Sequence, residues 1–159
     1  MKYLIIALLF CNLFSAQNKV DFTEIIKNNT DYFEGKKAEK HDVKIKFDSV
    51  YSSNQKEYLV KGVAEIDDKI LNISGQIIFN PKETKKLRDR SMYNFDVVLN
   101  AENASGPTPV FDGRLNIKMI PKIFNVIVFE GIYQDENGKN PMNFDNSDQI
   151  MKYLESLKK

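Results

Sequence analysis

Apolar and polar residues alternate with a period of two through most of the chain, from residue 43 to residue 133. Successive side chains of a β-strand point to opposite faces of its sheet, so this pattern is typical of strands with one buried face. The pattern occurs in six segments: VKIKFDSVY, EYLVKGVAEI, ILNISGQIIF, SMYNFDVVL, VFDGRLNIKMI and FNVIVFEGIY. The sequence therefore predicts a mainly β protein built on one antiparallel meander.

Turn sequences separate these segments. Residues 67–69 (DDK) join two of them directly and predict a tight hairpin. Residues 102–109 contain two prolines and a glycine and predict a loop. Asn137-Gly138 is a favoured hairpin turn, and it predicts a short seventh strand near Met142. Pro141 would hold that strand to an edge of the sheet, because proline cannot donate to a ladder.

Four of the segments carry a glycine on their apolar face, at Gly62, Gly75, Gly113 and Gly131. A glycine in a strand costs about 0.5–1 kcal/mol relative to alanine, so its repeated use needs a reason. Glycines allow strong coiling of a sheet and close approach of another backbone or side chain. We therefore expect a strongly curved meander or a closed barrel of six to seven strands.

The inward face of such a barrel is the candidate ligand site. Aromatic side chains on that face could fill the interior completely, which we favour, or the glycines could leave a cavity for a small apolar ligand. The candidate ligand-binding residues are Phe47, Gly62, Gly75, Phe95, Gly113, Phe129, Gly131 and Tyr133.

Helical spacing appears only near the two ends of the chain. An apolar stripe with Asp21 as N-cap and Gly35 just past its end predicts an N-terminal helix; its members are Phe22, Ile25, Ile26, Asn29 and Phe33. Asn146 and Gln149 resemble a capping box and predict the start of a C-terminal helix. Its apolar stripe consists of Ile150, Tyr153, Leu154 and Leu157.

Residues 1–16 have the order of a secretory signal peptide: Lys2, a short apolar run, and the small residues Ser15 and Ala16. A lipid anchor on Cys11 is the rival interpretation. Cleavage near Ala16 predicts a periplasmic or extracellular single domain of residues 17–159, which has no cysteine and relies on its core alone. Loss of Lys2 leaves 22 basic against 22 acidic residues, and this balance disfavours nucleic acid as a partner.

The strand succession from Val43 to Tyr133 and its glycines resemble the small calycin-like barrels, the class that contains lipocalins and short exported relatives. The Gly-x-Trp signature of true lipocalins is absent, because the chain has no Trp. The leader ending FSAQ and the abundance of Lys, Asn, Ile and Phe resemble exported proteins of Bacteroidetes-type bacteria. This resemblance implies a binding scaffold.

Residues that could support catalysis or metal binding are few. His41 is the one histidine, and a hydrolase would need it as base for Ser49, Ser52 or Ser53. Residues 135–140 are rich in oxygen ligands but lack the order of a calcium-binding EF-hand loop, so we favour a turn. We expect no catalytic residue, no metal site and no cofactor.

Two further features concern partners and modification. Residues 81–90 carry a local charge of +3, from five basic residues against Glu83 and Asp89. These basic residues, the candidate partner-binding set, are Lys82, Lys85, Lys86, Arg88 and Arg90. The triplet at residues 48–50 (DSV) resembles the O-glycosylation signal of exported Bacteroidetes proteins, with Ser49 as acceptor.

Together these features predict an exported, non-enzymatic binding module that docks a protein partner through its loops and an open edge strand, with inhibitor or immunity-like roles included. A carrier of a small apolar ligand is the first alternative. A hydrolase that depends on carboxylates or His41 is the second.

Overall fold

The structure, a computed structural model, describes residues 20–28, 31–54, 56–102, 107–121 and 123–158. The predicted signal peptide and Cys11 lie outside these ranges, as do residues 103–106 of the predicted loop 102–109. The described strands are β1 (Phe33–Lys37), β2 (His41–Asn54), β3 (Glu57–Ile66), β4 (Lys69–Phe79), β5 (Met92–Glu102), β6 (Val110–Ile120), β7 (Phe124–Asp135) and β8 (Gly138–Asp145). The described helices are α2 (Thr23–Lys27), α3 (Pro81–Lys86) and α4 (Ser147–Ser156).

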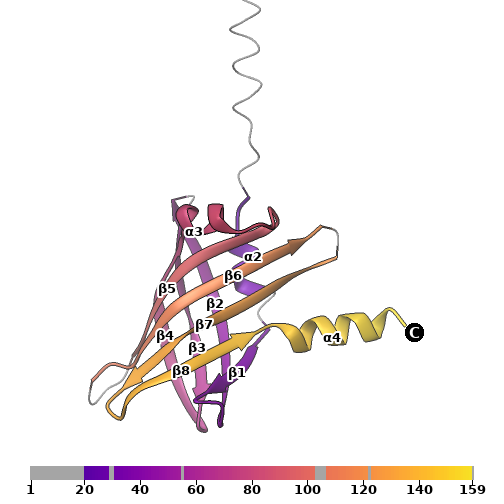
Figure 1. Ribbon diagram of the computed structural model, residues 1–159. Helices are drawn as coiled ribbons and strands as arrows, with labels where there is room; N and C mark the ends of the chain where they lie inside the picture. The colour runs from indigo at the N-terminus through magenta and orange to yellow at the C-terminus, as the bar shows by residue number, and fades with distance from the viewer. Residues whose placement is uncertain (1–19, 29–30, 55, 103–106, 122, 159) are drawn as a thin grey trace, which may run out of the picture.

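The strands form a closed antiparallel barrel. Each strand pairs with the next along the chain, and β1 pairs with β8 to complete the ring (Figure 1). The prediction of a mainly β meander that closes into a barrel is confirmed. The described residues contain eight strands, against the six to seven expected, and closure leaves no open edge strand for a partner.

The additional strand is β1, in a region where the sequence predicted the end of a helix and a connector. Helix α2 covers only Thr23–Lys27, and Asn28 ends it in the left-handed conformation with φ 54°. Phe33, the last member of the helical stripe, is instead the first residue of β1 and is fully buried. The prediction was wrong because tertiary pairing decides here: β1 gains hydrogen-bonded neighbours on both sides.

Strand β8 is longer and more central than expected. Pro141 does not place it at an edge, because β1 pairs with β8 from Met142 onward and ends opposite that residue. The hairpin between β7 and β8 is confirmed, but its two turn residues are Glu136 and Asn137. Gly138 follows them as the first residue of β8 with φ +119°, a conformation that favours glycine.

The inward side chains of the strands fill the barrel. Phe33 packs against both Phe47 and Phe144, and Phe129 stacks on Phe144 with ring centroids 4.4 Å apart. Phe22 of the α2 region closes one end of the barrel, with its ring centroid 5.0 Å from that of Phe95. The predicted alternation is confirmed at Phe47, Phe95 and Phe129, which are at most 1% exposed.

Close approach explains the glycines. A Cβ atom added at Gly75 would lie 2.1 Å from the carbonyl oxygen of Val98 in β5, so the neighbouring backbone occupies the place of a side chain. At the Gly113–Gly131 pair, an added Cβ would also lie within 2.8 Å of the Phe129 ring. The space over these glycines therefore holds protein atoms, and their purpose is tight coiling of the sheet.

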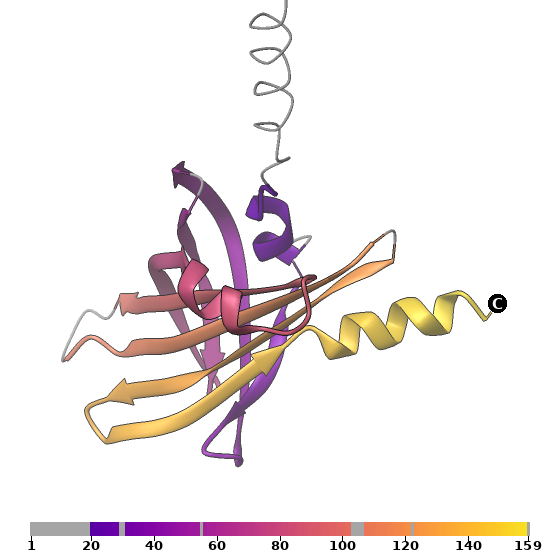
Figure 2. The same ribbon diagram turned by 45° about the horizontal axis from the view of Figure 1, so that its top comes forward.

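The connections divide between the two ends of the barrel. One end, here the α2 end, carries α2, α3, the β6–β7 turn and the start of α4 (Figures 1 and 2). The opposite end carries the β1–β2, β3–β4 and β7–β8 turns. Residues 81–90 and the described residues of the other predicted partner loop, 102 and 107–109, therefore lie at opposite ends and do not form one surface.

Replacement of Gly75 by alanine tests the coiling account. The Cβ atom cannot fit without a shift of β5, so we expect Gly75→Ala to lower the free energy of unfolding by about 2 kcal/mol or more. The matched control is Gln76→Ala, an outward position on the same strand, with an expected change within about 0.5 kcal/mol. Denaturant unfolding measures both, and equal stability of Gly75→Ala and the unmodified protein would contradict the account.

Candidate functional site

The predicted interior site is packed with protein side chains. Phe47, Phe95 and Phe129 are at most 1% exposed, and Tyr133 is 5% exposed near the end opposite α2. Burial and the carboxylates of Asp135 and Asp67 raise the pKa of Tyr133 to about 12. The packing of these side chains favours the filled interior over a ligand-carrying one.

The basic set of residues 81–90 does gather at the α2 end. Residues 81–86 form the short helix α3 where a loop was expected, and Asn80 caps it by accepting a 3.0 Å hydrogen bond from the Glu83 amide. Asn80, Pro81 and Glu83 at the N-cap, N1 and N3 positions are a helix-start signal that the sequence analysis missed. All five basic side chains are exposed.

Ion pairs neutralise part of this basic set. Lys86 Nζ lies 2.6 Å from Glu83, and Asp89 pairs instead with Lys118 at 3.1 Å. Hydrogen bonds from Ser91, together with Lys118, lower the pKa of Asp89 to about 2, so it stays charged. Within the described ranges, the other four basic side chains have no carboxylate within 4.0 Å; they are Lys82, Lys85, Arg88 and Arg90.

His41 and the serines proposed as its partners lie far apart. His41 begins β2 and contacts Asp67, whereas Ser49 is eight residues further along the strand. At about 3.3 Å per residue this separation is roughly 26 Å, too far for proton transfer. Ser49 itself is exposed beside a register shift of β2, and its glycosylation stays a prediction.

Metal binding finds no support in the described part of the chain, where no group of three or more His, Cys, Asp or Glu side chains could hold an ion. Residues 135–140 form the β7–β8 turn and the start of β8, and Asp135 there accepts a hydrogen bond from the amide of Asn137. None of the described helices is long and apolar enough to span a membrane.

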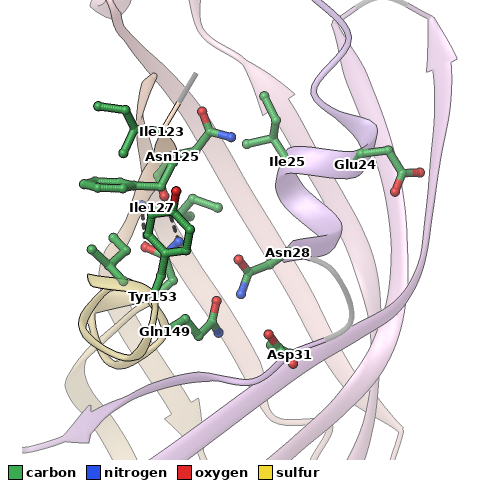
Figure 3. A pocket seen from close by; sticks show the side chains of 12 residues that line it. Glu24, Ile25, Asn28, Asp31, Ile123, Asn125, Ile127, Gln149 and Tyr153 are labelled. Carbon is green, nitrogen blue, oxygen red and sulfur yellow. Dashed lines mark hydrogen bonds between the residues drawn. The ribbon is translucent and has the colours of Figure 1, made fainter. Parts of the chain in front are cut away.

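The structure does show a groove that the sequence did not predict. It has a volume of about 510 Å³ and lies at the α2 end, between α2, the start of β7 and α4 (Figure 3). Its apolar side chains include Ile25 of α2, Ile123 beside the β6–β7 turn, and Ile150 and Tyr153 of α4. Ile123 is 53% exposed and Tyr153 is 42% exposed, so the groove is open to solvent.

Asn146 fixes the wall of the groove on the α4 side. Its Oδ1 accepts a 2.9 Å hydrogen bond from the Ile127 amide, and its Nδ2 donates to the carbonyl of Asn125 at 2.8 Å. The predicted capping box is therefore wrong, because the Asn146 side chain bonds β7 rather than the helix start. Gln149 instead donates to the carbonyl of Tyr32, just before β1.

Helix α4 is held by its first turn and then extends away from the barrel (Figure 1). The predicted helix is confirmed, but its apolar stripe is not covered. Tyr153, Leu154 and Leu157 are 42%, 37% and 64% exposed, and Met151 is 56% exposed. An uncovered apolar stripe next to an open groove has the features of an interaction surface.

Polar groups at the rim of the groove set its chemical preference. Glu24 and Asp31 supply carboxylates, and the described lining includes no lysine or arginine. Asn28 points from the end of α2 toward α4 (Figure 3), and its Nδ2 is buried without a hydrogen-bond partner in the described residues. The groove therefore offers apolar contacts and negative charge, with the Asn28 amide in its wall.

The closed antiparallel barrel is consistent with a calycin-like architecture. No protein-family model matches the chain, and no curated protein and no solved structure is significantly similar to it. The groove geometry is therefore the basis for any functional proposal.

Removal of the Asn146 side chain tests how the groove is built. Asn146→Ala would leave the Ile127 amide buried without a partner, so we expect a loss of about 1–3 kcal/mol in unfolding free energy. We also expect faster tryptic cleavage at Lys152, because α4 loses its attachment. Asn72→Ala, at an exposed position of β4, is the control, and an unchanged cleavage rate in Asn146→Ala would contradict this role.

Proposed function

We propose that the protein is an exported, non-enzymatic binding module that docks a protein partner at the α2 end of its barrel. The single observation that carries this proposal is the open groove beside the uncovered stripe of α4, at one end of a barrel filled with side chains. Inhibitor or immunity-like roles are included in this proposal.

The lining of the groove favours a polypeptide as the occupant. Its apolar walls suit one or two apolar side chains, and Asn28 Nδ2, which has no hydrogen-bond partner among the described residues, suits a main-chain carbonyl group. The carboxylates of Glu24 and Asp31 favour lysine or arginine in the same segment. The volume of about 510 Å³ is enough for a few side chains.

The basic set on α3 and residues 87–90 supplies the opposite charge at the same end of the barrel. A partner with an acidic surface next to a basic and apolar segment could place the segment in the groove and the acidic surface on the basic set. Only one orientation of the partner allows both contacts. Charge complementarity of this kind increases association rates and specificity more than affinity. We therefore propose that the groove provides most of the binding affinity and that the basic residues of the α3 region orient the partner.

Site-specific photo-crosslinking in the exporting cell tests this proposal. A photoreactive residue at Ile123, 53% exposed in the groove, is compared with one at Ile70, 74% exposed at the opposite end. We expect a discrete polypeptide to be crosslinked from Ile123 and not from Ile70. Equal yields from both positions, or no polypeptide from Ile123, would count against docking at the α2 end.

Charge reversal provides the second arm of this experiment. Replacement of Lys82, Lys85 and Lys86 by glutamate is expected to reduce the yield from Ile123 several-fold at low salt, with a smaller effect at high salt because ions screen exposed charges. If the effect of the charge reversal on the crosslinking yield did not depend on salt, α3 would not orient the partner through its charge. The intact mass of the recovered protein tests export, since cleavage after Ala16 removes residues 1–16.

A further inference from the structure

A second cavity lies at the end of the barrel opposite α2. It has a volume of about 150 Å³ and is formed by the end of β1, the β3–β4 turn, the start of β4 and the β7–β8 hairpin. Lys37, Asp67 and Tyr133 contribute its central polar groups, and Leu71 and Pro109 are among its apolar ones. This volume corresponds to roughly five waters at about 30 Å³ each, far below that of a fatty-acid or drug-sized pocket.

Lys37 is a charged residue in a buried position. It is 9% exposed, and its Nζ lies 2.6 Å from Asp67 and 5.3 Å from the centroid of the Tyr133 ring. An ammonium group has three N–H donors, and among the described residues only the bond to Asp67 uses one of them. The structure thus maintains a desolvated ammonium whose remaining donors have the cavity beside them.

Asp67 is held in place from several directions. Asp67 and Asp68 form the two-residue β3–β4 turn with φ of 52° and 61°, as a tight hairpin turn requires. His41 Nδ1 contacts the other carboxylate oxygen of Asp67. The hydrogen bond from Lys37 is the main reason that the pKa of Asp67 is lowered, so Asp67 remains an acceptor at neutral pH.

The resulting pair of a fixed donor and a fixed acceptor suits a hydroxyl group, which accepts from an ammonium and donates to a carboxylate at the same time. Lys37 and Lys69 contribute +2 to the lining, and the carboxylates of Asp67, Asp135 and Glu136 contribute −3, so its net charge is −1. This balance disfavours phosphate and other strong anions. Leu71 and Pro109 provide apolar contact for C–H groups.

We propose that this cavity binds the hydroxyl groups at one edge of a neutral sugar ring, held by Lys37 Nζ and the Asp67 carboxylate beside the Tyr133 side chain, while the rest of the ring lies outside the cavity. The site is independent of the groove at the α2 end, and it stands or falls separately from the proposed docking of a protein partner.

Titration of the isotope-labelled protein with a panel of neutral hexoses and pentoses, followed by amide NMR shifts, tests this proposal. We expect at least one sugar to give saturable shifts at Asp67, Asn137 and their neighbours, with a millimolar dissociation constant. Sodium phosphate and sodium acetate serve as anion probes and are expected to give none.

Variants separate a sugar site from a merely structural cluster. Asp67→Asn is expected to weaken sugar binding at least tenfold, and Tyr133→Phe, which retains the ring packed against Phe111, several-fold. Tyr153→Phe at the α2 end is the matched control and should leave binding unchanged. The proposal is overturned if no sugar gives saturable shifts, if an anion saturates the site instead, or if neither variant weakens binding.

Discussion

The hydrogen-bonded pairing of β1 with β8 is the constraint on which the rest of the structure depends. Four register pairs join the strands, from Glu34 with Asp145 to Lys37 with Met142. Without this pairing the sheet would have two open edges. The rings of Phe33 and Phe144, which pack together across it, would then be exposed to solvent. A strand of five residues therefore decides that the meander closes.

The same short strand connects the two candidate sites. Asp31 and Tyr32 precede β1, and there the Asp31 carboxylate lines the groove while the Tyr32 carbonyl accepts from Gln149 of α4. Lys37 ends β1 at the opposite end and supplies the buried ammonium of the smaller cavity. Closure of the barrel and placement of its functional groups are thus consequences of one pairing.

Much of the fold was predictable from local pattern. Alternation gave the inward residues of six strands correctly, and the two aspartates after β3 gave a tight turn. β1 was missed because Phe22, Ile25 and Phe33 also satisfy helical spacing, and only pairing with strands distant in sequence distinguishes the two. α3 could have been found, since Asn80 and Pro81 mark a helix start.

The candidate sites were less predictable, because their members are distant in sequence. The groove joins Ile25 to Tyr153, and the cavity joins Lys37 to Asp67 through a turn that no local pattern relates to β1. Asn146 looked like a helix cap and instead bonds the Ile127 amide on β7. The local sequence pattern predicts which face of each strand is buried. Which strand ends lie next to each other depends on the pairing register and on closure of the barrel.

The central claim is that aromatic side chains fill the barrel and leave binding to its ends, and titration with an apolar fluorescent probe, monitored also by amide NMR, tests it most directly. The account predicts no one-to-one saturation accompanied by shifts at buried positions such as Phe95, Leu99 and Phe129. Saturation at one probe per chain with shifts at these positions would contradict it and would support a carrier of apolar ligands.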